Sequence, residues 1–190
     1  MEAWKQHYKP ILIGERLVIV PAWMDSPDAN RIPIKIDPGM AFGTGTHPTT
    51  QLCLELMERE FTTRQPRQVI DVGCGSGILS IAALKLGAVS VLGVDIDAGS
   101  IDNARENANN NSVGEELIMG VGSVREILDD KFPLRKAPLV VANILAPVII
   151  RLFDLGLADL IEAHGTILLS GILQEQAQNV VDAAQAKGLR

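Results

Sequence analysis

The chain has 190 residues, a formal net charge of −6 at pH 7 and 47% hydrophobic residues. This length suits one domain with a sizeable core, and the apolar content excludes a disordered chain. The acidic balance argues against direct nucleic-acid binding, and no apolar run reaches the roughly 20 residues of a membrane span. The start lacks a signal-peptide layout, and Cys53 and Cys74 show no metal-ligand spacing. The sequence therefore predicts a soluble, cytoplasmic protein with reduced thiols.

The first 36 residues are predicted to be a lead-in segment and not a separate domain. Ile11–Val20 is rich in β-branched residues, which favours a strand or a hairpin that turns near Gly14 and Glu15. A helical turn is expected at Trp4–Tyr8, and a loop at Pro21–Pro33.

The next segment, residues 37–50, is rich in Gly, Thr and Pro and reads DPGMAFGTGTHPTT. Thr49 or Thr50 can cap a helix over Gln51–Arg59. His47 could act as a base, but a role in structuring the loop is favoured.

Strands and helices alternate from residue 68 to the end of the chain. Strands are expected at 69–72, 90–94, 116–119, 139–142 and 166–170, and helices at 77–86, 99–109, 147–163 and 174–186. Such alternation predicts a mostly parallel sheet with helices on both faces. Residues 37–190 are thus predicted to form a Rossmann-like, doubly wound α/β domain whose ligand binds at the carboxyl ends of the strands.

The sharpest motif is a glycine-rich turn that follows a predicted strand and opens a helix: Asp71-Val-Gly73-Cys-Gly75-Ser-Gly77. Glycines allow a tight turn and close approach of a ligand to the backbone, and amides at a helix start can bind a carboxylate. Asp71 suits a ligand that carries an amino group. The spacing is not that of a nicotinamide site, because position 78 is Ile. A purely structural turn is the alternative.

The second candidate anchor is Asp95, at the end of a predicted strand and 24 residues after Asp71. A carboxylate at this strand tip can accept both ribose hydroxyls of a nucleoside. Asp97 is a weaker alternative for that role. Ile96 can pack on an adenine face, although it needs no such role if it is buried.

The third candidate anchor is Asn143, which closes the apolar strand 139–142. In a doubly wound sheet it lies beside the first strand, where its side-chain oxygen can accept a hydrogen bond from a substrate amine. The alternative is an Asn that caps the following helix.

These residues resemble the class I methyltransferases and, within them, the ribosomal protein L-eleven methyltransferase family. The resemblance covers nearly the whole chain from about Trp4, and residues 37–50 are its most specific segment. The segments that carry it are 37–50, 69–83, 141–146 and 170–173.

The resemblance implies a cytoplasmic S-adenosylmethionine-dependent enzyme that methylates lysine side chains and the terminal amine of a ribosomal protein. It also implies cofactor contacts at Thr50, Gly73, Asp95 and Asn143, with Phe42–Thr50 folded over the methionine end. Family members carry an additional amino-terminal recognition domain and a final strand pair, and neither is expected here. A chain truncated in this way would leave a sheet edge near 166–170 exposed, open to self-association.

Methyl transfer to an amine needs alignment, exclusion of water and a neutral nucleophile. Desolvation beside a sulfonium lowers an amine pKa, so no dedicated base is required. Asn143 is the predicted amine-orienting, catalytic residue. The alternatives are a methyltransferase of another protein or of a small molecule, and an inactive cofactor-binding fragment.

Overall fold

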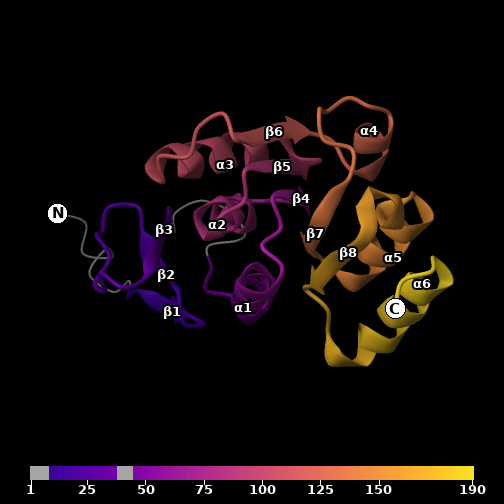
Figure 1. Ribbon diagram of the computed structural model, residues 1–190, viewed down its shortest axis with the longest axis horizontal. Coiled ribbons are helices and arrows are strands. Elements are labelled where there is room, and N and C mark those ends of the chain that lie inside the picture. The colour runs from indigo at the N-terminus through magenta and orange to yellow at the C-terminus, as the bar shows by residue number, and fades with distance from the viewer. Residues whose placement is uncertain (1–8, 38–44) are drawn as a thin grey trace.

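The computed structural model describes residues 9–37 and 45–190, and these ranges form two sheets flanked by helices (Figure 1). The smaller sheet has the order β1-β2-β3 and the larger one the order β6-β5-β4-β7-β8. The turn predicted at Trp4–Tyr8, and residues 38–44 of the Gly/Thr/Pro segment, lie outside the described residues.

The smaller sheet consists of β1 (Ile11–Ile13), β2 (Leu17–Pro21) and β3 (Ile32–Ile36). β1 and β2 pair antiparallel with Ile13 opposite Leu17, which confirms the predicted hairpin. β3 pairs parallel to β2, so the loop prediction was wrong from Ile32 onward. Alternation explains the strand, since Ile34 and Ile36 point into the core. Pro33 is tolerated because β3 is an edge strand of its sheet.

The larger sheet is parallel throughout, which confirms the predicted Rossmann-like α/β fold. The central strand β4 has β5 on one side and β7 on the other, so the chain changes direction of winding between β4 and β7. Ligands of such sheets bind outside the carboxyl ends of the strands at this switch point. The strands are β4 (Gln68–Val72), β5 (Ser90–Asp95), β6 (Leu117–Val121), β7 (Ala137–Asn143) and β8 (Ile161–Ser170).

Helices cover both faces of this sheet. Successive residues of each strand point to opposite sides, and apolar side chains on both sides are buried by helices. Val69 and Val141 face α1, α2 and the smaller sheet, whereas Ile70 and Val140 face α4, α5 and α6. In Figure 1 the smaller sheet lies at the left, beside α1 and α2, and β8 lies at the opposite side with α5 and α6. The helices are α1 (Pro48–Thr63), α2 (Ile78–Leu86), α3 (Ala98–Asn110), α4 (Val124–Leu128), α5 (Ala146–Asp154) and α6 (Ala177–Ala186).

The sequence predicted one helix over 147–163, and the structure has a shorter one. α5 ends at Asp154, and Gly156 follows with a φ of +101°, which a residue with a side chain would adopt only under strain. A Cβ there would also approach the Leu128 side chain to 2.6 Å. A short 3-10 turn, Leu157–Leu160, then leads into β8, which begins at Ile161.

β8 lies at the edge of the larger sheet, as predicted, and pairs only with β7 within residues 9–37 and 45–190. All of its residues from Gly165 to Ser170 are half-buried. Self-association through this edge stays a prediction. None of the helices in the described ranges is both long and apolar enough to cross a membrane.

Candidate functional site at the carboxyl edge of the sheet

The glycine-rich turn follows β4 and leads into α2. Gly73, Gly75 and Gly77 all have positive φ angles, of 76°, 51° and 77°. A Cβ on Gly73 would lie 2.6 Å from the Ile144 side chain, and one on Gly77 would lie 3.0 Å from the Cβ of Ala104. The turn therefore requires glycine both for its conformation and for its close packing.

Backbone amides of the turn bind the end of β5. The amides of Gly73 and Cys74 donate to the Val94 carbonyl over 2.8 and 3.0 Å. The amide of Gly75 donates to Oδ2 of Asp95 over 2.9 Å, and the amide of Asp97 donates to Oδ1 over 3.0 Å. An ionised carboxylate offers about four acceptor positions, so Asp95 retains capacity for two hydroxyl donors while it holds the turn.

The residues after Asp95 divide into an exposed apolar side chain and a helix cap. Ile96 is 78% exposed, so it serves no core role and its face is open to a ligand. Asp97 caps α3, because its carboxylate accepts hydrogen bonds from Ser100 and from the amide of Gly99. These hydrogen bonds, chiefly from the Ser100 hydroxyl, lower the pKa of Asp97. The weaker ribose candidate is thus engaged in local structure.

Asp71 lies at the end of β4 and is fully buried beneath the turn. Its Oδ2 accepts a 2.6 Å hydrogen bond from the Ser80 hydroxyl, and its Oδ1 has no partner among the described residues. Burial raises the pKa of Asp71 to about 7, with a further rise from the charge of Asp95 and an opposing effect of the Ser80 hydrogen bond. An unpartnered buried carboxylate oxygen is costly. A cationic group bound above the turn would lower that cost.

Asn143, at the end of β7, is joined to the start of α1. Its Nδ2 donates to Oγ1 of Thr50 over 3.0 Å, and Thr50 is 2% exposed. The neighbouring strand makes a parallel contact, because the Ser170 hydroxyl donates to the Thr49 carbonyl over 2.8 Å. The amide oxygen of Asn143 accepts no hydrogen bond from the described residues, so it can still accept one from a substrate amine.

The start of α1 corrects the predicted cap. His47 is the N-cap, with Pro48 next, and its Nδ1 accepts a hydrogen bond from the Thr49 amide over 3.3 Å. The same ring nitrogen lies 2.8 Å from the Thr49 hydroxyl. Thr50 does not cap the helix, because its hydroxyl is buried against Asn143. The structural role favoured for His47 is confirmed.

Both cysteines are buried and form no disulfide. Burial, with a smaller contribution from Asp71, raises the pKa of the Cys53 thiol to about 12, and burial raises that of Cys74 as well. Neither is therefore a thiolate nucleophile at neutral pH. Within residues 9–37 and 45–190, no three His, Cys, Asp or Glu side chains gather as metal ligands.

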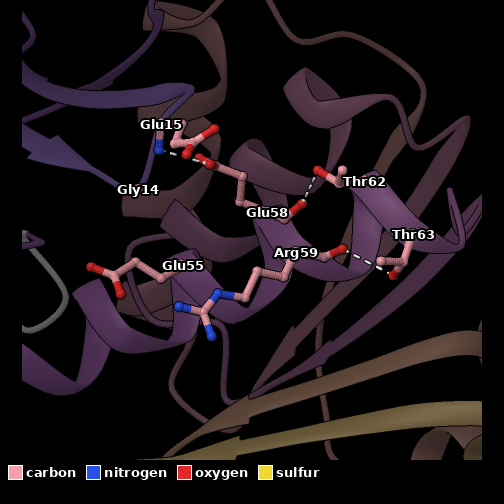
Figure 2. A pocket seen from close by; sticks show the side chains of 7 residues that line it. All are labelled: Gly14, Glu15, Glu55, Glu58, Arg59, Thr62 and Thr63. Atoms are coloured by element: carbon pink, nitrogen blue, oxygen red, sulfur yellow. Dashed lines mark hydrogen bonds between the residues drawn. The ribbon is translucent and has the colours of Figure 1, made fainter.

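A cavity of about 310 Å³ lies away from this edge, between the β1–β2 turn and the second half of α1 (Figure 2). Among the residues that line this cavity, Glu58 holds its two sides together. This largely buried carboxylate accepts hydrogen bonds from the amides of Glu15 and Arg16 over 2.8 and 3.0 Å. These hydrogen bonds attach the β1–β2 turn of the smaller sheet to α1, which packs against the larger sheet. The cavity is lined by Gly14, Glu15, Glu55, Glu58, Arg59, Thr62 and Thr63.

The structure brings all the sequence-predicted anchors to adjoining strand ends of one sheet. Three further residues were missed: Ser80 as the partner of Asp71, Ser170 as a tether for α1, and Asn107, which donates to the Ser76 carbonyl. The available signal was a polar residue at a position where helical periodicity or strand alternation predicts an apolar one.

Known proteins of one family resemble this chain over nearly its whole length. A family profile described as ribosomal protein L11 methyltransferase (PrmA) matches residues 1–190. The chain belongs to the ribosomal protein L11 methyltransferase family. A curated relative of that name from Haemophilus influenzae (strain PittEE) is 47% identical over 180 residues, which cover 95% of this chain.

Solved structures agree with this family assignment. The ribosomal protein L11 methylase from Lactobacillus delbrueckii subsp. bulgaricus matches with a TM-score of 0.82 and 37% identity, over 95% of this chain and 89% of that one. A Podospora anserina methyltransferase solved with bound SAH shares the fold alone, at 16% identity and a TM-score of 0.54, over 75% of this chain and 70% of that one. The chain spans 58% of the length of the Haemophilus relative.

Proposed function

We propose that this chain is the catalytic part of an S-adenosylmethionine-dependent protein N-methyltransferase. Its substrate would be a ribosomal protein, by analogy with the names of its family relatives. The acceptor groups would be lysine side chains and the terminal amine, as the family resemblance implies. One observation carries the proposal: the glycine turn, the Asp95 carboxylate and the Asn143 amide adjoin at the carboxyl edge of β5, β4 and β7.

The residues at this edge fit the cofactor's chemical groups. The amides of the glycine turn suit a carboxylate, the remaining acceptor positions of Asp95 suit the ribose hydroxyls, and the exposed Ile96 suits the adenine face. The buried, unpartnered oxygen of Asp71 suits positive charge from the amino group or the sulfonium. When bound, S-adenosylmethionine supplies an activated methyl group with a good leaving group.

The protein's own task is to present a neutral amine. A lysine ammonium, with a reference pKa of about 10.4, loses its proton more readily when it is desolvated beside positive charge. The amide oxygen of Asn143 can accept a hydrogen bond from the amine nitrogen, while Thr50 holds the opposite end of that amide in place. This arrangement orients the amine without a general base, in line with the structural role of His47.

A ribosomal protein substrate would place the reaction in the cytoplasm, and the net charge of −6 would favour a basic partner over nucleic acid. The division into a lead-in, residues 1–36, and a cofactor-binding domain, residues 37–190, is part of the same proposal.

A second function stays in view because the chain matches only 58% of the Haemophilus relative's length. With other recognition elements the same edge could methylate another protein or a small molecule. A fragment that binds the cofactor without turnover is the third possibility.

The test combines calorimetry with S-adenosylmethionine and transfer of radiolabelled methyl groups to purified ribosomal protein L11. Asp95→Ala should abolish measurable binding, whereas Asp97→Ala, a carboxylate two residues away that only caps α3, should leave binding intact. Asn143→Ala should lose at least about tenfold in kcat at saturating cofactor, with a smaller loss of cofactor affinity from its expected cofactor contact.

Each other result has a distinct meaning. Unchanged affinity in Asp95→Ala would refute the ribose assignment. Methylation of other lysate components but not of L11 would favour the second function. Cofactor binding without any product would identify a binding fragment.

A further inference from the structure

α3 and its C-cap, Asn111, together carry two asparagines whose side chains are buried against the core. Ile101, Ala104, Asn107 and Asn111 recur at helical spacing, and all four are buried, with Asn107 completely enclosed. A buried amide must find hydrogen-bond partners or destabilise the fold. The partners of these two amides show what each one holds.

The Asn107 amide bridges the glycine turn and Asp37, the residue that follows β3. Its Nδ2 donates to the Ser76 carbonyl, inside the glycine turn, over 3.0 Å. Its Oδ1 accepts a hydrogen bond from the amide of Asp37, the first residue of the 37–50 segment, over 3.1 Å. Nδ2 also lies 3.3 Å from Oδ1 of Asn103, one turn earlier in the helix. One planar group therefore fixes the separation of the turn and the start of that segment.

Close packing leaves the turn little room around this contact. Ala104, one helical turn before Asn107, would lie 3.0 Å from a Cβ on Gly77, and Ser76 is only 2% exposed. α3 also begins immediately after the ribose candidate, with Asp97 as its cap. α3 therefore connects the end of β5, at Asp95, to the glycine turn through its own packing and hydrogen bonds.

Asn111 offers an internal comparison, because it makes the same kind of contact without touching the turn. Its Oδ1 accepts from the Lys35 amide over 2.8 Å, and its Nδ2 donates to the carbonyls of Lys35 and Asn107 over 2.6 and 2.8 Å. It secures β3 to the end of α3. Loss of Asn111 should therefore destabilise the fold without freeing the Ser76 carbonyl.

We propose that Asn107 is a positioning residue for the cofactor: its side chain holds the glycine turn, at Ser76, against Asp37. This inference rests on the proposed function for its consequence in binding, but the contact itself does not depend on it. Asn107 is fully buried and does not touch the amine-orienting Asn143, so it acts on cofactor affinity and not on the methyl-transfer step.

The experiment compares Asn107→Asp with Asn111→Asp in the 190-residue chain. Both substitutions keep the side-chain shape, replace a donor by an acceptor and add one negative charge to α3. The first readout is hydrogen exchange of the backbone amides of residues 73–77 without ligand. The second is the Kd for S-adenosylmethionine by calorimetry, together with KM and kcat for methyl transfer.

Asn107→Asp should speed exchange in the glycine turn and raise the Kd and the cofactor KM about tenfold, with kcat at saturating cofactor within about twofold of wild type. Asn111→Asp should change neither the exchange of that turn nor the Kd by more than about twofold. The cofactor carries a carboxylate as well as cationic groups, so the added charge needs its own controls. Asn111→Asp adds the same charge to the end of the helix, and Asn107→Ala adds none.

Equal effects of the two variants on exchange and Kd would overturn the inference, as would a loss confined to kcat. If wild type fails to bind S-adenosylmethionine, the proposed function fails, and the exchange experiment still decides whether Asn107 holds the turn. If either Asp variant does not fold, the pair Asn107→Ala and Asn111→Ala gives the same comparison.

Discussion

Replacing Asp71 by asparagine should stabilise the unliganded protein against unfolding. The gain in unfolding free energy over wild type should be larger at pH 8 than at pH 5. Burial raises the pKa of Asp71 from 3.8 to about 7 in the folded state. The folded protein then binds more protons than the unfolded chain between about pH 4 and pH 7. Its stability therefore falls as pH rises through that window, and the full penalty is present above pH 7. Asparagine has nearly the same shape, carries no charge and escapes the penalty.

The size of the effect follows from the pKa. Each unit of difference between the folded and unfolded pKa values corresponds to about 1.36 kcal/mol, so between pH 5 and pH 7 the wild type should lose about 2 kcal/mol relative to Asp71→Asn. The side chain is fully buried, so solvent does not screen the effect. The charge of Asp95 on the neighbouring strand acts in the same direction, and the Ser80 hydroxyl of α2 opposes it.

Urea unfolding at half-unit steps from pH 5 to pH 8.5 measures this difference. Two controls frame it. Asp97→Asn removes an exposed carboxylate whose pKa is lowered, so its titration lies below pH 4 and its difference from wild type should be flat over the range. Ser80→Ala removes the hydrogen bond that favours ionised Asp71 and should move the transition to higher pH. A constant gap between wild type and Asp71→Asn from pH 5 to pH 8 would refute the reasoning.

Three further substitutions test other parts of the structure. Gly73→Ala should destabilise the fold and weaken S-adenosylmethionine binding at least about tenfold by calorimetry, because a Cβ at φ +76° would lie 2.6 Å from the Ile144 side chain. Glu58→Ala should cost about 2–3 kcal/mol in urea unfolding without changing cofactor affinity, since its carboxylate accepts two backbone hydrogen bonds far from the sheet edge; a loss of affinity would contradict that separation. Thr50→Val should lower kcat more than cofactor affinity, because it removes the acceptor that holds Asn143; unchanged steady-state kinetics would show that Asn143 needs no such support.

The strands, most helices and the glycine turn could be predicted because their signals are local. Apolar runs at 69–72, 90–94 and 139–142 locate β4, β5 and β7 within a residue or two. The positive φ angles of Gly73, Gly75 and Gly77 follow from glycine's freedom at a turn between a strand and a helix. Parallel pairing then brings Asp95 and Asn143 to the same edge of the sheet without further assumption.

Long-range contacts account for what could not be predicted. Thr50 has the residue type of a helix cap, but its hydroxyl binds Asn143, 93 positions away, and His47 caps the helix instead. The start of β8 was hidden for a similar reason. Leu157 and Leu160 continue a helical apolar pattern, although Gly156 has already ended the helix. Ile161 and then residues 166–170 pair with β7.

The buried polar residues near the site follow one rule, and Asp71 is its informative exception. Thr50 is bonded to Asn143, and Asn107 is bonded to the glycine turn, so each amide or hydroxyl that is removed from water is satisfied by the segment it holds. Among residues 9–37 and 45–190, only one of the two carboxylate oxygens of Asp71 has a hydrogen-bond partner, although Asp71 is enclosed as completely as Asn107. A fold that satisfies its other buried groups at this edge gains nothing in stability from that omission. The incomplete partnership fits the proposed cofactor, which would bring positive charge to this edge, and the proposal predicts cofactor binding that strengthens as Asp71 ionises.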